Sequence, residues 1–327
     1  MSNRRLDITP VSSPLKAAFA ISRGSKTSAE TVRVRVQQGD RTGWGECVPY
    51  GRYGETIESV TATIETLREA LEAGLTRADL QAQMPAGAAR CAVDCALWDL
   101  EAKMTGTPVW QLAGLPEPKP VETAVTVSLD TPEKMAEAAR AIRGQLLKLK
   151  LGGAEDLKRI EAVHVARPDA RLIVDANEGL VPAEFPNISR AAAALGVVLI
   201  EQPFPAGDDA ALERRPGPVA ICADESAHTA ADMQDLARRY DAVNVKLDKA
   251  GGLTEALAMV RAAKACGMGV MVGCMVAGSL SMAPAVLLAG LCDAADLDGP
   301  LWLKDDVAHG LTYRDGMVEP PSSGLWG

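Results

Sequence analysis

Apolar and polar positions follow one pattern in the first third of the chain and another in the rest. In residues 31–36 apolar and polar side chains alternate strictly, which is typical of a half-buried strand, and residues 44–48 read as its return strand after a short turn. Helical spacing follows over residues 56–73 and 87–104. Residues 1–117 therefore predict an α+β unit in which antiparallel strands come first and helices follow.

From residue 118 onward short apolar runs alternate with helical stretches. Such alternation predicts parallel strands joined by crossover helices. Eight runs within residues 118–299 predict a TIM barrel of the (β/α)7β type, with the last helix missing or replaced. An open doubly wound sheet is the alternative, but that fold usually has a glycine-rich turn after its first strand, where Val127 here runs into Ser128. The runs are 121–127, 146–151, 171–175, 197–200, 219–222, 242–246, 269–272 and 294–297.

The tail from about residue 300 shows no further barrel repeat. Residues 312–318 predict a small hairpin. We expect this tail to complete the N-terminal unit, so that residues 1–117 together with 300–327 form a capping domain on a barrel of residues 118–299.

Charge and cysteine usage exclude several classes of function. A net charge of −9 argues against nucleic acid and anionic membrane surfaces as partners, and no apolar run is long enough to span a bilayer. Seven cysteines without CxxC spacing, and no visible signal peptide, favour a cytoplasmic location. We expect a homo-oligomer whose partner is a small molecule.

Charged residues follow most of the apolar runs of the predicted barrel. In an α/β barrel the active site is built at the carboxyl ends of the strands. From Lys150 to Lys246 the charges recur at intervals of 22 to 26 residues, which places them at the same height in successive units. Charges on solvated faces would instead be scattered through helices and loops. The residues are Lys148, Lys150, Asp175, Glu201, Asp224, Glu225, Lys246, Asp296 and Asp298.

Three of these carboxylates, Asp175, Glu201 and Asp224, follow consecutive predicted strands with no histidine or cysteine among them. A set of oxygen ligands suits Mg²⁺ rather than Zn²⁺, so we expect these residues to bind one Mg²⁺ per subunit. We expect Asn177 and Glu225 to orient the ligands or the lysines. A helix N-cap would explain Asp224 alone, but not carboxylates after three strands in a row.

Two lysine-bearing strands flank this acidic triad. A lysine acts as a base only when it is neutral, and a second cation and a metal ion nearby favour the neutral form. A metal between two opposed bases suits removal of a proton α to a carboxylate, with the enediolate held on the metal. A base on each face of such an intermediate would allow inversion of the α-carbon.

These residues resemble the enolase superfamily, in its muconate-lactonizing subgroup with two catalytic lysines, and within it the dipeptide epimerases. The resemblance covers essentially the whole chain. The Asp-x-Asp pair at Asp296 and Asp298 is the feature that identifies the dipeptide group. The motifs are Lys148-Leu-Lys150, Asp175-Ala-Asn177, Glu201-Gln-Pro203, Asp224-Glu225, Lys246, Gly273-Cys-Met275 and Asp296-Leu-Asp298.

The resemblance implies a role for each site residue. Lys150 and Lys246 would be the two acid/base catalysts, and Lys148 would contact the substrate carboxylate beside Lys150. Thr123 and Cys274 would line the substrate. Arg23, in a polar loop over residues 21–27, would bind an acidic side chain of the substrate, with Arg52 as the competing candidate.

The positive charge at the N-terminus of a dipeptide would explain why two acids, Asp296 and Asp298, lie at the end of the eighth predicted strand. Neither is needed for the metal ion, and two carboxylates side by side repel one another unless a cation lies between them. The α-ammonium of the N-terminal residue of a dipeptide is the candidate cation. A turn at Asp298 beside Gly299-Pro300 is the structural alternative.

The expected function is therefore a Mg²⁺-dependent epimerase of dipeptides, with L-Ala-D/L-Glu from murein as the expected substrate and two-lysine 1,1-proton transfer as the mechanism. An N-acylamino-acid racemase or an o-succinylbenzoate synthase shares the lysines and the metal ligands but has no need of two further acids. A non-catalytic binding protein on the same fold is the alternative from a different class, and it should have lost at least one ligand or base.

Overall fold

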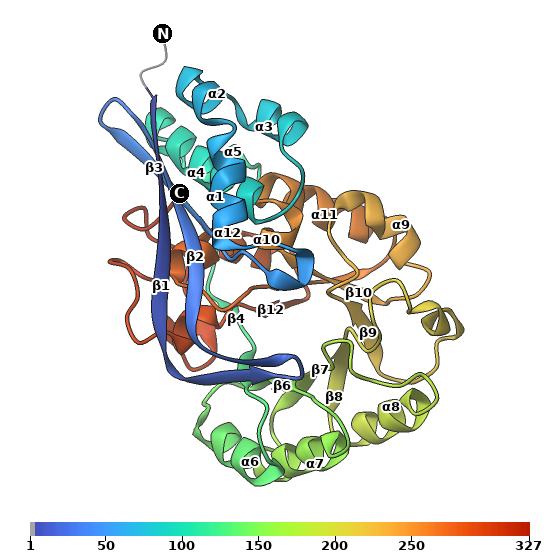
Figure 1. The fold of residues 1–327 in the computed structure, drawn as a ribbon. Coiled ribbons are helices and arrows are strands. Elements are labelled where there is room, and N and C mark those ends of the chain that lie inside the picture. The colour runs from blue at the N-terminus through green and yellow to red at the C-terminus, as the bar shows by residue number, and fades with distance from the viewer. Residues whose placement is uncertain (1–3) are drawn as a thin grey trace.

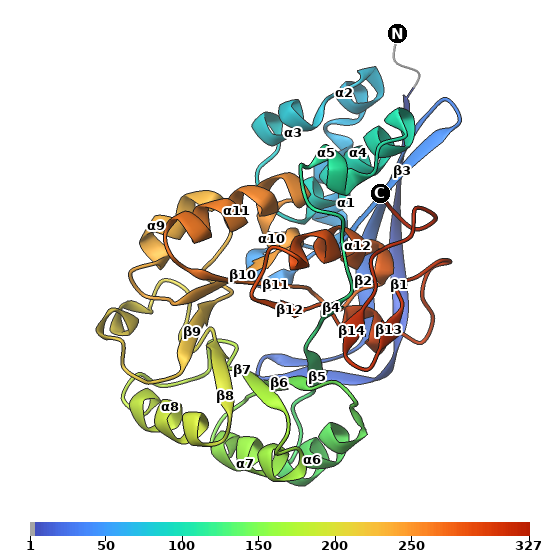
Figure 2. The same cartoon turned by 180° about the vertical axis from the view of Figure 1, so that it is seen from behind.

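The computed structural model describes residues 4–327. Its N-terminal part is a three-stranded antiparallel sheet of order β1-β2-β3, formed by β1 (Arg4–Ile21), β2 (Gly24–Gln38) and β3 (Arg41–Cys47). The β1–β2 hairpin is long, and its register shifts between Pro14 and Phe19. Beyond this shift the hairpin bends over toward β6 (Figures 1 and 2). There Ala20 accepts a hydrogen bond from the backbone N–H of Leu129 at 3.1 Å, which ties the hairpin to the barrel.

The prediction of a polar loop over residues 21–27 was wrong in its extent. Gly24 already begins β2, and Phe19 and Lys26 are direct partners across the hairpin. The segment has no apolar alternation because it lies at the end of a hairpin whose side chains are mostly exposed or half-buried. Only Ser22 and Arg23 remain between the two strands.

Helices pack against one face of this sheet. The helix predicted over 56–73 is divided into α1 (Ile57–Glu65) and α2 (Arg68–Ala73). At the break the hydroxyl of Thr66 donates to the carbonyl of Thr63, a side-chain bond that competes with helix continuation. The helix predicted over 87–104 is α4 (Ala88–Thr105), which approaches β3 so closely that a Cβ at Gly45 would lie 2.0 Å from the carbonyl oxygen of Ala92. Two short helices complete the layer: α3 (Arg77–Gln83) and α5 (Val109–Leu112).

The remainder of the chain is centred on an eight-stranded parallel sheet that closes into a barrel. Its order is β12-β11-β10-β9-β8-β7-β6-β5, and the backbone N–H of Ala124 donates to the carbonyl of Ala295 at 2.8 Å to join the two ends. The predicted α/β barrel is thus confirmed. The strands are β5 (Val125–Val127), β6 (Leu146–Lys150), β7 (Arg171–Asp175), β8 (Val197–Glu201), β9 (Ala220–Ala223), β10 (Ala242–Lys246), β11 (Gly269–Gly273) and β12 (Ala294–Asp296).

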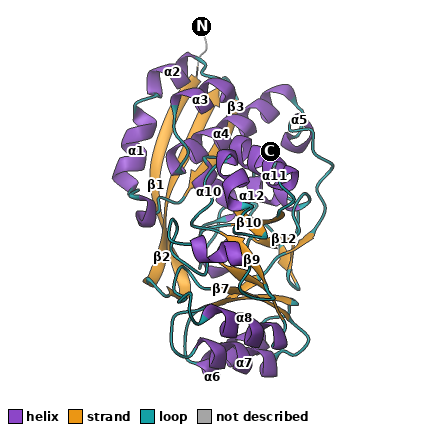
Figure 3. Ribbon diagram, turned by 90° about the vertical axis from the view of Figure 1, so that its right-hand side faces the viewer, coloured by secondary structure: helices purple, strands orange, loops and turns teal. Residues whose placement is uncertain are grey.

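Helices surround the barrel, and the three-stranded sheet runs along one side of it (Figure 3). Strands β8 and β9 are followed by short 3-10 turns at Ala210–Arg214 and Ala230–Asp232, and β12 is followed by a 3-10 turn at Gly299–Trp302 in place of an eighth helix. The helices are α6 (Pro132–Ala141), α7 (Asp156–Ala166), α8 (Phe185–Ala194), α9 (Met233–Leu236), α10 (Leu247–Ala250), α11 (Leu253–Ala265) and α12 (Ser279–Ala289). Within residues 4–327, none of them has both the length and the apolar character needed to cross a membrane.

The tail connects the barrel to the N-terminal part. The run predicted as one strand over 121–127 is split, because β4 (Val121–Glu122) leaves the barrel and pairs with the tail hairpin of β13 (Tyr313–Arg314) and β14 (Met317–Val318). After this hairpin the chain returns to β3 and α4. The indole N–H of Trp326 donates to the carbonyl of Trp44 at 2.9 Å, and the backbone N–H of Gly327 donates to the side chain of Asp99 at 2.8 Å.

We predict that Trp326 holds the tail on the cap. Its side chain is buried, so Trp326→Ala should lower the free energy of unfolding by about 3–5 kcal/mol through the cavity and the lost hydrogen bonds. Trp326→Phe, which keeps most of the volume, should cost clearly less. Urea denaturation followed by circular dichroism measures both, and an alanine variant as stable as the wild type would show that the tail contributes little to the cap.

Candidate active site

The sheet order brings the predicted site residues together at the carboxyl ends of neighbouring strands. Asp175 ends β7, Glu201 ends β8, and Asp224 directly follows β9. Lys150 ends β6 on one side of these strands, and Lys246 ends β10 on the other. Lys150, Asp175 and Glu201 lie in register on adjacent strands, so the charges form one layer across the barrel mouth.

The three carboxylates converge. Asp175, Glu201 and Asp224 are buried, and one oxygen from each lies within 4.8 Å of the others. Burial, followed by the charge of Asp175, raises the pKa of Glu201 to about 8. Three buried carboxylates this close together need positive charge between them, and the donor set is oxygen only. These residues therefore fit a hard divalent cation.

Lysine ammonium groups surround the same oxygens. The Nζ of Lys148 lies 2.6 Å from Glu201, 2.7 Å from Asp296 and 3.3 Å from Asp175. Burial alone would lower the pKa of Lys148, but the attraction of Asp296 and Glu201 outweighs burial and the pKa lies well above its usual value. The acids around Lys148 thus favour its charged form, which suits contact with an anionic group.

The other two lysines form simpler pairs. Lys150 lies 2.5 Å from Asp175, and Lys246 lies 2.7 Å from Asp224. Burial would raise the pKa values of both aspartates, but the lysines outweigh it and the pKa values are lowered. Because the two ammonium groups belong to strands on opposite sides of the triad, a planar group lying over the triad would meet one lysine on each face.

Two further residues hold the triad in place, and the sequence did not single them out for a role. Lys249 in α10 is buried and donates to the carboxylate of Asp224 at 2.6 Å, and the side-chain amide of Asn244 donates to Glu201 at 2.7 Å. Asn244 lies two residues before Lys246 on β10, so both side chains share one face of the strand. That spacing is the signal that could have identified Asn244, whereas Lys249 follows the strand and has no such marker.

Asn177 and Glu225 lie beside the triad as predicted, although their roles stay predictions. The backbone N–H of Asn177 donates to Asp175 at 3.0 Å, with the residue at a φ of 44°. Its carbonyl faces the cap and accepts from Arg23 at 2.9 Å. Glu225 pairs with Arg23 at 2.7 Å, and burial followed by the charge of Asp224 raises the pKa of Glu225.

A cavity of about 420 Å³ opens above these residues, between the barrel mouth and the cap. Both catalytic candidates, Lys150 and Lys246, line it from the barrel. The cap contributes the end of the β1–β2 hairpin and the loop around Tyr50. The segment after β11 contributes Cys274, Met275 and Val276, and the loops after β7 and β9 contribute Asn177, Asp224 and Glu225.

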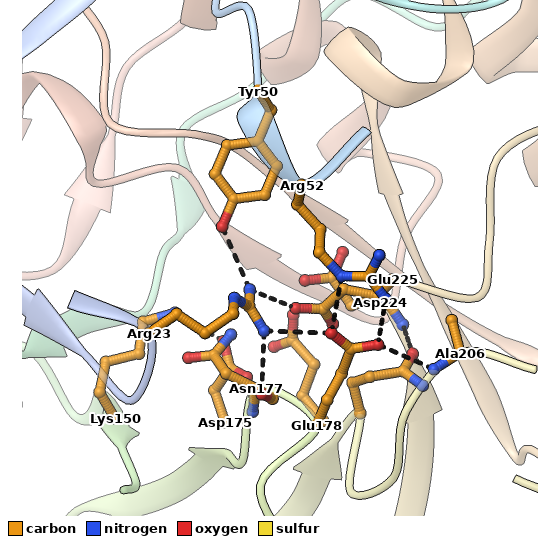
Figure 4. A network of polar contacts seen from close by, with 12 residues as sticks. Arg23, Tyr50, Arg52, Lys150, Asp175, Asn177, Glu178, Ala206, Asp224 and Glu225 are labelled. Carbon is orange, nitrogen blue, oxygen red and sulfur yellow. Dashed lines mark hydrogen bonds and ion pairs between the residues drawn. The ribbon is translucent and has the colours of Figure 1, made fainter. Parts of the chain in front are cut away.

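Figure 4 shows how the two candidate arginines differ. Arg23 points into the cavity from the hairpin and donates to Glu225, to the carbonyl of Asn177 and, at 3.1 Å, to the hydroxyl of Tyr50. Arg52 instead pairs with Glu178 at 2.8 Å and is more exposed to solvent. The geometry brings Arg23 nearer to the acidic triad, and a contact of either arginine with substrate stays a prediction.

Four predicted substrate contacts lie deeper than the cavity wall. The side chains of Thr123, Lys148, Asp296 and Asp298 are buried and are not part of the lining. The hydroxyl of Thr123 accepts from the backbone N–H of Leu297 at 2.8 Å, and Asp298 accepts from the backbone N–H of Thr126 at 2.7 Å, so both also help to close the barrel.

Cys274 connects these acids to the cavity. Burial, followed by the charges of Asp296 and Asp298, raises the pKa of the Cys274 thiol well above its usual value, because both carboxylates lie close behind it. Asp296 keeps one buried oxygen, Oδ1, without a hydrogen-bond donor from residues 4–327. Burial and the nearby Asp296 also raise the pKa of Asp298 to about 6. This corner of the barrel therefore has an acceptor oxygen and negative charge that its neighbours do not fully compensate.

Comparison with known proteins identifies two family models that together span most of the chain. Residues 4–114 match the mandelate racemase/muconate lactonizing enzyme N-terminal domain, and residues 131–325 match the enolase C-terminal domain-like family. The chain is 46% identical to the L-Ala-D/L-Glu epimerase of Escherichia coli K12 over 93% of this chain and 96% of that protein. It is 44% identical to an N-acetyl-D-glutamate racemase of a Pseudoalteromonas species, over 87% of this chain and 91% of that protein.

A solved structure is similar over the whole chain. It is an enolase family member from Agrobacterium tumefaciens with homology to dipeptide epimerases, with bound sodium and L-Ala-L-Glu. Its sequence is 51% identical, the match covers 99% of this chain and 100% of that one, and the TM-score is 0.96.

We predict that the triad binds a divalent cation and that Asp224 is required for it. Mg²⁺ at 100 times its dissociation constant should stabilise the wild type by about 2.7 kcal/mol, seen as a rise in Tm, and Asp224→Asn should lose most of this rise. Asp293→Asn is the matched control, because Asp293 accepts from the backbone N–H of Val270 at the start of β11, away from the site. A full Mg²⁺-dependent rise in the Asp224 variant would contradict the assignment.

Proposed function

The chain belongs to the mandelate racemase/muconate lactonizing enzyme family of the enolase superfamily, and from this membership we propose that it is a dipeptide epimerase that acts on L-Ala-D/L-Glu. The observation that carries the proposal is the pair of lysines on opposite sides of three convergent carboxylates. The expected cytoplasmic location, the homo-oligomeric state and the place in murein peptide metabolism are part of the same proposal.

The reaction follows from the positions of the two lysines. One of them, in its neutral form, takes the proton from the α-carbon of the C-terminal residue, and the other, as an ammonium group, returns a proton to the opposite face. Because Lys150 and Lys246 are paired with Asp175 and Asp224, each pair must open before its lysine can act as a base. The roles exchange for the reverse reaction.

The substrate carboxylate needs positive charge when the α-proton leaves. Mg²⁺ is the cation that three carboxylates on rigid strands suit best, and when bound it would supply charge to polarise that carboxylate. Lys148 adds a fixed positive charge from within the barrel. Asp296 and Asp298 would receive the α-ammonium of the N-terminal residue, one peptide unit away.

An N-acylamino-acid racemase is the second candidate, because one relative of similar identity is an N-acetyl-D-glutamate racemase. Such a substrate has no α-ammonium, so Asp296 and Asp298 distinguish the two. A non-catalytic binding protein is the third candidate. Every ligand and base that the reaction needs is present, which argues against that class.

We predict that Lys246→Ala abolishes epimerisation of L-Ala-L-Glu but leaves exchange of the α-proton of one epimer, catalysed by Lys150. Lys150→Ala should show the complementary pattern with the other epimer. Mass spectrometry of each epimer in D₂O measures the exchange, and Lys158→Ala, an exposed lysine of α7, is the control. Exchange of both epimers at the wild-type rate in the Lys246 variant would refute the two-base scheme, and a wild type without exchange on any dipeptide would favour a binding protein.

We also predict that the wild type prefers a free α-ammonium. N-acetylation of L-Ala-L-Glu should cost most of the activity of the wild type and little of what remains in Asp296→Asn/Asp298→Asn, because the acetyl group removes the charge that these acids bind. Rates of epimerisation of both compounds decide this. If the wild type instead turns over N-acetyl-glutamate faster than L-Ala-L-Glu, the protein is an N-acylamino-acid racemase.

A further inference from the structure

One basic side chain in the cavity has no anionic partner. Arg23, Arg52, Lys150 and Lys246 also line the cavity, and each is paired with a carboxylate at 2.5–2.8 Å. Lys26 lines the same cavity, yet no carboxylate or carbonyl of residues 4–327 bonds to its ammonium group. The Nζ of Lys26 instead lies over the ring of Phe19, 5.9 Å from the ring centroid.

Lys26 is not a freely solvated surface lysine. It lies on β2 opposite Phe19, and burial, more than the charge of any neighbour, lowers the pKa of Lys26. Lys26 is half-buried at the cavity wall, so its ammonium group loses part of its hydration while no acid compensates for the loss. Such a group at the wall of a binding cavity is explained if a bound anion supplies the missing partner.

The surroundings hold Lys26 close to the reacting centre. The ring of Phe19 lies 5.9 Å from the ammonium of Lys26 and 6.0 Å from that of Lys150, so one aromatic side chain lies beside both cations. Phe19 in turn packs edge-on against Trp302 of the tail, with ring centroids 4.8 Å apart. Lys26 is therefore positioned by an aromatic pair rather than by an acid.

Arg23 is in the opposite situation. Its guanidinium already donates to Glu225 at 2.7 Å, to the carbonyl of Asn177 and to Tyr50, and it also lies 3.3 Å from Glu178 (Figure 4). A substrate carboxylate would have to displace Glu225, a buried acid, from this arginine. The contacts of Arg23 tie the hairpin to the loops after β7 and β9, which suits holding the cavity closed.

We propose that Lys26 binds the side-chain carboxylate of an acidic C-terminal residue of the substrate, and that Arg23 positions the hairpin over the barrel mouth. This inference rests on the proposed function, since it names the residue that selects glutamate or aspartate over neutral side chains. It replaces Arg23 by Lys26 as the side-chain anchor. The side chain of a glutamate in the reacting position would extend from the α-carbon, beside Lys150, toward the hairpin.

The test compares L-Ala-L-Glu with L-Ala-L-Gln, which has the same shape without the charge. Lys26→Met should lower kcat/KM for L-Ala-L-Glu about 10- to 100-fold, the size of a lost hydrogen bond to a charged group, mainly through KM. It should change kcat/KM for L-Ala-L-Gln less than about 3-fold. Lys26→Arg should retain most of the preference for glutamate. Lys16→Met is the matched control, because Lys16 is an exposed lysine of β1 that does not line the cavity.

Arg23→Met provides the comparison that can overturn the proposal. If Arg23 positions the hairpin, its loss should reduce kcat/KM for both dipeptides by similar factors. A loss confined to L-Ala-L-Glu in the Arg23 variant, with the two dipeptides affected equally in the Lys26 variant, would assign the anchor to Arg23. A wild type that epimerises neither dipeptide would refute the proposed function instead, so the two failures are distinguishable.

Discussion

The compensation of buried charge is the constraint on which the rest of this structure depends. Asp175, Glu201, Asp224 and Asp296 are all buried at the mouth of one barrel, where a lone carboxylate would be neutralised or expelled. Lysines balance them through short ion pairs, and Lys249 adds a fourth cation behind Asp224. A buried ion pair is weak evidence for stability but costly to break from one side. The members of the cluster therefore depend on one another, because the loss of any one of them leaves another buried charge unpaired.

The β1–β2 hairpin of the cap covers the cavity above this cluster and is held there by contacts with the barrel and the tail. Ala20 of the hairpin bonds to Leu129, Arg23 bonds to the loops after β7 and β9, and Trp302 of the tail packs on Phe19. Trp302 also donates to Asp298 at 3.3 Å, so the tail contacts both the hairpin and a buried acid of the site. The tail thus supports the hairpin that lines the cavity, although the two segments are far apart in the sequence.

The barrel and the charges at its strand ends could be predicted because buried parallel strands leave a simple pattern. Both faces of such a strand are covered, so Val243 and Val245 are apolar and the first charge after them, Lys246, marks the strand end. The 18 residues of β1 left no such pattern, because all of this edge strand except Leu6 and Leu15 is exposed or half-buried and it contains Pro10 and Pro14. The sequence did not single out Lys26 either. Its proposed contact with the substrate depends on the bend of the hairpin, which brings it to the cavity, and not on its neighbours in the sequence.

The chemistry and the choice of substrate are supported by different parts of the structure. The lysines that we propose as acid/base catalysts and the acids beside them are fixed by strand register in the barrel, where a change at Glu201 would disturb Lys148 and Asn244 together. Arg23 and Lys26 extend from a hairpin that reaches the barrel through a few hydrogen bonds, and neither of them contacts the three carboxylates of the triad. This arrangement explains physically how relatives named as a dipeptide epimerase and as an N-acetyl-D-glutamate racemase can be similarly close to one chain. Epimerisation of a dipeptide and racemisation of an N-acetyl amino acid both invert an α-carbon, and the same barrel can serve both. The preference for an acidic side chain or for a free α-ammonium depends only on a few charged side chains around the cavity.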